Sequence, residues 1–280
     1  MKFLISGGYG DCVNQLAKAI SYKKENNITD VEMVYIRDSI DEQILDNAKP
    51  LTRDYASWVE QIAKINGFEK FSVIVGDQKK LCEQLHNETV GSNIVIFGPN
   101  MNYDLKIFEQ QRGLYIGTRP FEKEYTPQFP VNWIYEDKKL SDKSVLIQVR
   151  FAIEYPTKIP NASWKDLTEI LLLVNKVKEK GYEPILIGET QIQGFDKFSR
   201  ICGYNINCSA LEAYDLILSA KYLIGFSGFF SNIALTSGKP ILRMMWDEAE
   251  YHLQTHNDMK KYVTHFDHNN LFQQLDTFLQ

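Results

Sequence analysis

Short apolar segments alternate with helical segments along the whole chain, and this alternation constrains the fold more than any other feature of the sequence. In the first half, strands are predicted at residues 2–6, 31–36, 70–75 and 93–97, and helices from residue 11, at 55–66 and at 77–86. In the second half, strands are predicted at residues 144–150, 183–187, 222–225 and 240–244, and helices at 163–180, 211–220, 229–237 and 270–279. The strands are apolar without strict alternation, which is typical of a parallel sheet covered on both faces.

The two halves are separated by residues 118–142, which carry three prolines and mixed charges and show no clear period. A chain of 280 residues is long enough for two domains of ordinary size. We therefore predict an α/β protein with two doubly wound, Rossmann-like domains, at residues 1–140 and 141–280, that face each other across a cleft. Small-molecule sites on such sheets lie at the carboxyl ends of the strands.

Composition and charge argue against several other classes of protein. The longest apolar run, residues 170–174, is far shorter than a membrane span, and the chain start lacks a signal-peptide hydrophobic stretch, so we expect a cytoplasmic protein without stable membrane insertion. The net charge of −5 gives no overall attraction to nucleic acid. The four cysteines form no C-x-x-C pair, and we do not interpret the histidines as a zinc motif, so no metal site is predicted.

In the first half, Gly7, Gly8 and Gly10 follow a strand and open a helix, where backbone N–H groups and the helix dipole can bind an anion or a sugar hydroxyl. Neither a dinucleotide-binding G-x-G-x-x-G motif nor a phosphate-binding loop is present. Asp11 follows directly. It has two interpretations, the cap of the first helix or a carboxylate general base.

In the second half, Arg150 closes a strand and Lys158 follows in a loop, where both cations can reach a phosphate. The other interpretation is two solvated surface charges. Residues 224–234 form a buried strand, a small-residue turn and a helix start with hydroxyl side chains. Backbone N–H groups with Ser227 and Ser231 can cradle a diphosphate there, or the two serines can simply cap the helix.

Several segments follow one another along the chain in a fixed order. They are Gly10-Asp11, Lys158-Ile159-Pro160 with Trp164, Ile187-Gly188-Glu189, residues 223–228, residues 231–234 and Gly238-Lys239-Pro240. This order resembles that of the heptosyltransferase-like (family 9) glycosyltransferases of the GT-B fold, over roughly the whole chain. The resemblance implies an inverting, metal-independent transfer of a sugar from a nucleotide diphosphate to a hydroxyl acceptor. It implies no cofactor besides this donor substrate, which the C-terminal domain holds, and the absence of an Asp-x-Asp motif agrees with metal independence.

The resemblance also implies roles for particular residues. Asp11 matches the base that acts on the acceptor, and Lys158 matches the lysine that neutralises the donor phosphates. The acceptor-side loop contains Gly8 and Gly10, and the donor-binding set comprises Arg150, Lys158, Gly188, Glu189, Ser227, Gly228, Ser231 and Asn232. Arg150 is included because its segment is also similar to one in GT-B fucosyltransferases, where an arginine grips the nucleotide phosphate.

The sequence departs from the family at two places. Ser227-Gly228-Phe229 stands where the family usually has Asp-Ser-Gly or Asp-Thr-Gly, and Asn232 stands where it has histidine. The donor sugar and its nucleotide therefore stay open. The acceptor is a glycan, a lipid-linked saccharide or, as in some bacteriophage enzymes, a hydroxymethylated base in DNA. Two further alternatives are a non-catalytic nucleotide-sugar-binding protein and an epimerase of the same fold.

Overall fold

A computed structural model describes residues 1–6, 9–38, 55–76, 94–96, 140–149, 164–188, 203–206, 210–226, 228–244 and 261–280, and the structural statements below concern these residues. They form two compact units, one made by the described residues up to 96 and the other by those from 140 onward. In these segments, no helix combines the length and the apolar content needed to cross a membrane.

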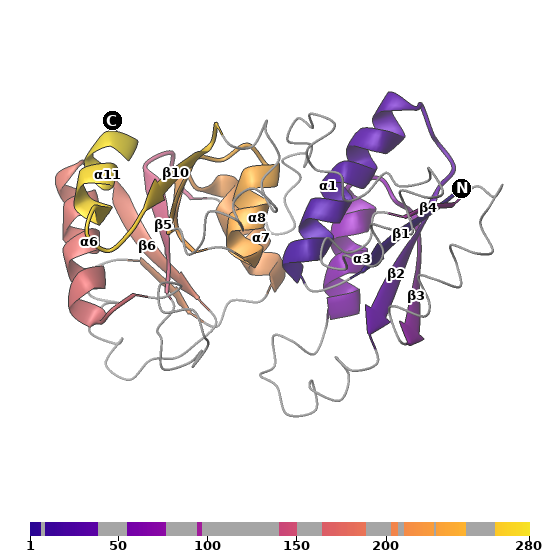
Figure 1. Cartoon of the computed structure of the whole chain (residues 1–280), viewed down its shortest axis with the longest axis horizontal. Coiled ribbons are helices and arrows are strands. Elements are labelled where there is room, and N and C mark those ends of the chain that lie inside the picture. Colours follow the sequence, from indigo (N-terminus) through magenta and orange to yellow (C-terminus); the bar gives the residue numbers. More distant parts are fainter. Residues whose placement is uncertain are drawn as a thin grey trace. The chain divides into compact units, whose positions relative to one another are not determined.

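The N-terminal unit is a parallel sheet with helices against it (Figure 1). Its elements are β1 (Lys2–Ser6), α1 (Tyr9–Glu25), β2 (Glu32–Asp38), α3 (Tyr55–Ile65), β3 (Lys70–Gly76) and β4 (Ile94–Ile96). The strand order is β3-β2-β1-β4, and α1 and α3 contact each other as they pack on the sheet. Four consecutive residues of β1, from Phe3 to Ser6, are buried, so both faces of this strand are covered, as the unbroken apolar pattern predicted.

Helix α1 begins two residues earlier than predicted. It starts at Tyr9, so Gly10 lies in the first helical turn and not in the preceding loop, and Asp11 is the third helical residue. The interpretation of Asp11 as the helix cap is therefore wrong. The end of α3 agrees with the sequence, because Gly67 follows with a φ of 84°, a left-handed conformation that glycine adopts without strain.

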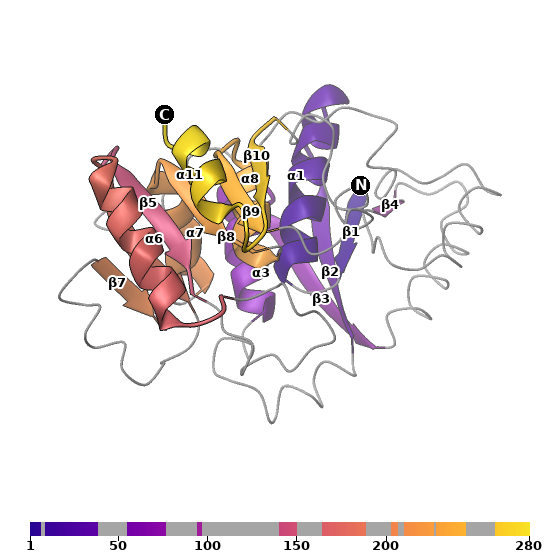
Figure 2. The ribbon, with the colours of Figure 1, turned by 60° about the vertical axis from the view of Figure 1, so that its left-hand side comes forward.

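The C-terminal unit is a six-stranded parallel sheet with helices on both faces (Figures 1 and 2). Its elements are β5 (Ser144–Gln148), α6 (Leu167–Glu179), β6 (Glu183–Gly188), β7 (Gly203–Ile206), α7 (Ala210–Ser219), β8 (Tyr222–Gly225), α8 (Phe229–Thr236), β9 (Ile241–Met244), β10 (Val263–Phe266) and α11 (Leu271–Phe278). The strand order is β10-β9-β8-β5-β6-β7. Helices α6 and α11 cover one face, and α7 and α8 cover the other (Figure 1). The predicted doubly wound α/β architecture is confirmed.

Two strands and one helix start in this unit differ from the sequence prediction. The pattern missed β7 and β10, which have four residues each, half of them polar or glycine, and which form the two edges of the sheet. The predicted helix at 163–180 begins only at Leu167. Asp166 caps it, accepting a hydrogen bond from the Glu169 N–H at 3.0 Å. Trp164 thus lies outside the helix, although it is fully buried.

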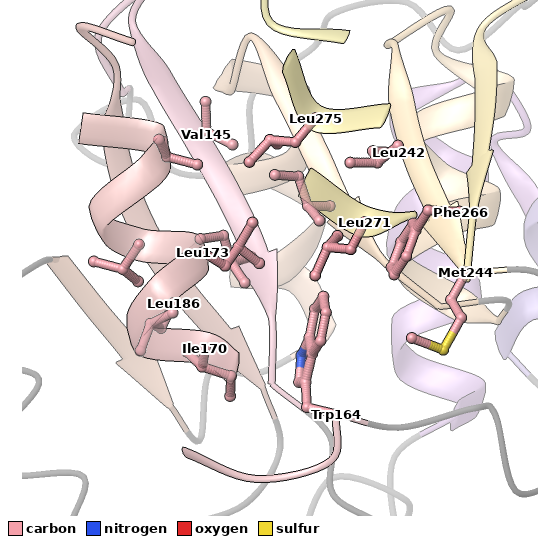
Figure 3. Packing of buried hydrophobic residues seen from close by; sticks show 14 of the residues in the cluster. Val145, Trp164, Ile170, Leu173, Leu186, Leu242, Met244, Phe266, Leu271 and Leu275 are labelled. Carbon is pink, nitrogen blue, oxygen red and sulfur yellow. The ribbon is translucent and has the colours of Figure 1, made fainter. Parts of the chain in front are cut away.

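One hydrophobic core of this unit lies between the sheet and the helices α6 and α11 (Figure 3). Trp164 lies where this core reaches the carboxyl ends of the strands. The Trp164 ring meets Phe226 edge-on, with centroids 5.0 Å apart, and stacks on Phe266 at a centroid distance of 5.9 Å. Aromatic pairs in these geometries add to the free energy of burial. The core therefore extends to the strand ends, the edge of the sheet at which ligands bind.

Two adjacent leucines of α6 test which face of the helix is buried. Leu173 is fully buried, whereas Leu172 is 52% exposed. We expect Leu173→Ala to lower the free energy of unfolding by about 2–5 kcal/mol, because it leaves a cavity. We expect Leu172→Ala to change it by less than about 0.5 kcal/mol. Urea denaturation measures both, and equal effects of the two substitutions would contradict this packing.

Candidate functional site

Both sheets contain a switch point, a pair of neighbouring strands from which the chain connections run in opposite directions. In the C-terminal sheet these strands are β5 and β8, because β6 and β7 lie beyond β5 while β9 and β10 lie beyond β8. In the N-terminal sheet they are β1 and β4. Ligands of doubly wound sheets bind outside the carboxyl ends of the strands at such points. The strand ends at these two places define the candidate site of each unit.

At the C-terminal switch point, the side chain of Gln148 joins β5 to the end of β8. Its Oε1 accepts a hydrogen bond from the Phe226 N–H at 3.0 Å. Its backbone carbonyl accepts one from the Trp164 indole Nε1 at 2.6 Å. The register pairs Ile147 with Ile224, so a regular parallel ladder would direct the Phe226 N–H to the Gln148 carbonyl. The Gln148 side-chain oxygen thus replaces the Gln148 backbone carbonyl as the acceptor for Phe226, and the backbone carbonyl accepts from the Trp164 indole instead.

This carboxamide also explains a glycine. A Cβ on Gly225 would lie 2.6 Å from Gln148 Oε1 and 2.8 Å from Gln148 Cβ, closer than real carbon atoms approach. Gly225 is not among the glycines with positive φ, so contact and not backbone conformation requires glycine here. Gly188, at the end of β6, is similar, since its Cβ would lie 3.0 Å from the Val149 carbonyl oxygen. Bare backbone therefore lines this edge of the sheet.

Helix α8 begins directly after this edge, at the cap residue Gly228. Gly228 has a φ of 135°, a conformation that side chains rarely permit. Its N–H donates to Ser231 Oγ at 3.0 Å, and that hydroxyl donates to the Gly228 carbonyl at 2.9 Å. Ser231 is fully buried and Asn232 nearly so. In this structure Ser231 therefore caps the helix, which is one of its two sequence interpretations.

A buried cation lies two strands from Gln148. Arg243 on β9 is in register with Gly225, is 3% exposed, and pairs in register with His265 on β10. Burial and, secondarily, the charge of Arg243 lower the pKa of His265 from 6.5 to about 4. His265 is therefore neutral at pH 7, and the arginine supplies the positive charge of this pair.

At the N-terminal switch point, α1 follows β1 after only two residues, Gly7 and Gly8. Gln15 of α1 reaches back to the last residue of β1. Its Oε1 accepts from the Ser6 N–H at 2.8 Å, and its Nε2 donates to the Ser6 carbonyl at 2.7 Å. Asp11 lies one helical turn before Gln15, so the predicted base belongs to the first turn of the helix that this contact ties to the strand.

The remaining predicted site residues, Gly8, Arg150, Lys158, Glu189 and Ser227, lie outside the described residues. Within the described ranges, His, Cys, Asp and Glu side chains form no group of three that would hold a metal ion. Sequence reasoning missed Gln15, Gln148 and Arg243 as site residues. Two signals were available in the sequence. Gln15 is a polar residue four positions after Asp11, and Gln148 is a polar residue at the end of an apolar strand.

No protein-family model matches the sequence, and no curated protein matches it. Solved structures do match the fold. The E. coli ADP-heptose LPS heptosyltransferase II is similar with a TM-score of 0.52 and 11% identity, over 100% of this chain and 98% of that one. The E. coli heptosyltransferase WaaC, solved with ADP, is similar with a TM-score of 0.51 and 9% identity, over 87% of each chain. At these identities the similarity is one of fold, and the fold is GT-B.

The contact between Gly225 and Gln148 predicts an energetic coupling. We expect Gly225→Ala to lower the free energy of unfolding by about 1–3 kcal/mol, because its methyl group overlaps Gln148. In a Gln148→Gly background the same substitution should cost less, which a double-mutant cycle measures. Gly181→Ala is a matched control, since nothing lies within 4 Å of its Cβ position and only its φ of 81° opposes alanine. A cost of Gly225→Ala that is independent of residue 148 would contradict the close contact.

The lowered pKa of His265 predicts a pH dependence of stability. The folded pKa of about 4 lies below the ordinary 6.5, so the unfolded chain binds this proton more tightly and stability falls as pH drops from 6.5 to about 4. His265→Asn removes this contribution, so the variant should lose less stability than wild type across that interval. Urea midpoints at several pH values measure the difference. Parallel curves for the two proteins would show that His265 is not buried as described.

Proposed function

We propose that this protein is a glycosyltransferase that transfers a sugar from a nucleotide-diphosphate sugar to a hydroxyl group of an acceptor, with inversion and without a metal. One observation carries the proposal. A chain with the fold of two heptosyltransferases has, at its C-terminal switch point, a glycine-lined strand edge leading into the N-terminus of α8. This is the kind of place where doubly wound sheets hold phosphate groups.

In this proposal the C-terminal unit binds the donor. Negative charge develops on the β-phosphate as the sugar leaves, and fixed positive groups stabilise it in place of a metal. The backbone N–H groups at the start of α8 supply part of that charge. Arg150 and Lys158 follow β5 by two and ten residues and supply the rest. One similar heptosyltransferase was solved with ADP, so ADP is the first nucleotide to test.

The N-terminal unit then supplies the base. The acceptor oxygen attacks the anomeric carbon, the bond from that carbon to the β-phosphate oxygen breaks, and the acceptor proton passes to the Asp11 carboxylate. Attack on the face opposite the leaving diphosphate inverts the anomeric configuration. We propose a saccharide hydroxyl, on a glycan or a lipid-linked saccharide, as the acceptor, and the cytoplasm as the place of reaction.

The experiment compares nucleotide binding with sugar transfer in wild type and in Asp11→Asn. Thermal shifts with ADP, GDP, UDP, CDP and dTDP, with and without EDTA, identify the nucleotide, because a ligand of the folded state raises Tm. The matching nucleotide sugars, with ADP-heptose first, are then assayed for release of nucleoside diphosphate with saccharide acceptors. Asp11→Asn should keep the thermal shift and lower transfer by about 10²–10⁴-fold, the usual contribution of a general base.

Two further variants complete this experiment. Lys158→Ala and Arg150→Ala should reduce the nucleotide-dependent shift, because each removes a charge from the diphosphate. A shift that EDTA abolishes would contradict metal independence. No shift with any of the five diphosphates would overturn the proposal. Conversion of a nucleotide sugar without an acceptor would assign the chain to epimerases, and binding without turnover would assign it to non-catalytic nucleotide-sugar-binding proteins.

A further inference from the structure

We infer that Gln15 is a positioning residue, which fixes the end of β1 and thereby the start of α1 that carries Asp11. The inference rests on the proposed function, in which Asp11 is the base. It concerns a residue that does not itself contact the reacting atoms. The observation behind it is the pair of hydrogen bonds between the Gln15 carboxamide and the Ser6 backbone.

The Gln15 carboxamide is buried and hydrogen-bonded at both ends. Gln15 is only 4% exposed, and a buried amide that lacks hydrogen-bond partners is costly. Both ends of its carboxamide are used on one residue, with Oε1 accepting from the Ser6 N–H at 2.8 Å and Nε2 donating to the Ser6 carbonyl at 2.7 Å. Two hydrogen bonds to the backbone of one residue fix distance and orientation together. The contact therefore locks Ser6 to α1.

The contact between Gln15 and Ser6 lies on the β4 side of β1. The Glu32 N–H donates to the Met1 carbonyl, so odd-numbered residues of β1 direct their backbone groups to β2. Even-numbered residues, Ser6 included, direct theirs to the β4 side. Among the described residues, the pairing with β4 runs from Lys2 to Leu4, which lies opposite Ile96. The Gln15 carboxamide therefore bonds both backbone groups of Ser6 on the β4 side of β1, at the switch point.

The contact between Gln15 and Ser6 lies one helical turn from Asp11. Only Gly7 and Gly8 separate Ser6 from α1, and Asp11 precedes Gln15 by four residues, one turn of the same helix. A base must lie within hydrogen-bond reach of the acceptor hydroxyl, and a misplacement of about 1 Å can cost about 10²-fold in rate. A helix tied to the strand end by Gln15 has a fixed first turn. Loss of that tie should lower the rate of transfer and not the affinity for donor.

The test uses the full chain and three variants. Gln15→Met keeps the length of the side chain and removes both hydrogen bonds. We expect it to lower kcat for transfer from the donor identified above, with ADP-heptose as the first probe, by about 10–100-fold, while the donor KM and the nucleotide thermal shift stay unchanged. Gln61→Met in α3, where Nε2 donates to Ser57 Oγ at 3.1 Å, is the matched control and should leave kcat unchanged.

Gln15→Glu separates positioning from mere stability. A protonated carboxylic acid can donate to the Ser6 carbonyl and accept from the Ser6 N–H, as the amide does, whereas a carboxylate cannot donate. The kcat of this variant, divided by that of wild type at the same pH, should therefore rise as pH falls from about 8 to about 5, since burial next to a carbonyl favours the protonated acid. Protonation also restores the stability of a buried glutamate, so kcat is expressed per folded protein, with the folded fraction measured by circular dichroism at each pH. On that basis a variant that is only less stable would show no such recovery.

The outcomes separate this inference from the proposed function. A folded Gln15→Met protein with wild-type kcat, alongside an inactive Asp11→Asn, overturns the positioning role and leaves the proposed function intact. An Asp11→Asn protein with wild-type transfer overturns Asp11 as base, and the inference with it. A pH-independent ratio for Gln15→Glu, or an equal loss of kcat and donor binding in Gln15→Met, assigns Gln15 to fold stability alone.

Discussion

Where parallel strands end beside each other at a switch point, their last backbone N–H and C=O groups no longer form the regular ladder with the neighbouring strand. Such groups are costly when buried, so something must take the neighbour's place without filling the crevice that a ligand needs. In both units a glutamine carboxamide bonds such a group in place of a backbone group. Gln15 bonds both backbone groups of Ser6, and Gln148 accepts from Phe226. A carboxamide has the donor and acceptor of a peptide group, so it substitutes for one residue of a strand.

The surrounding structure follows from these substitutions. The Gln148 side chain lies so close to residue 225 of β8 that only glycine fits there. The Gln148 backbone carbonyl does not bond Phe226, so it can accept the hydrogen bond from the Trp164 indole. That indole also packs between Phe226 and Phe266. Trp164 therefore belongs both to the hydrophobic core and to the strand edge of the candidate site. A change in its packing should also displace the Gln148 backbone at that edge. The proposed sugar transfer depends on this rigidity, since fixed dipoles act only where they are held.

The accuracy of the sequence predictions varied with the length and polarity of the segments. Strands such as β1 and β6 were predicted within a residue, because burial on both faces leaves an unbroken apolar run inside each strand. The strands β7 and β10 were missed, because short edge strands carry too few apolar residues to form a pattern. Trp164 fits the helical period of α6 but lies before its cap at Asp166, because burial alone does not locate a helix start. Asp11 was predicted as a possible cap and is helical instead.

The sequence by itself determined the alternation of strands and helices, the two-unit α/β class and the glycines at the strand ends, because periodicity and the absence of a Cβ are local properties. Tertiary structure decided which strands are neighbours, and so where the switch points lie. It also decided that Gln15 and Gln148 are structural partners of Ser6 and Phe226, and that Arg243 lies beside Gly225. The contact of Gln148 with Phe226 joins residues 78 positions apart in the chain, and only the strand order of the folded sheet brings such groups together.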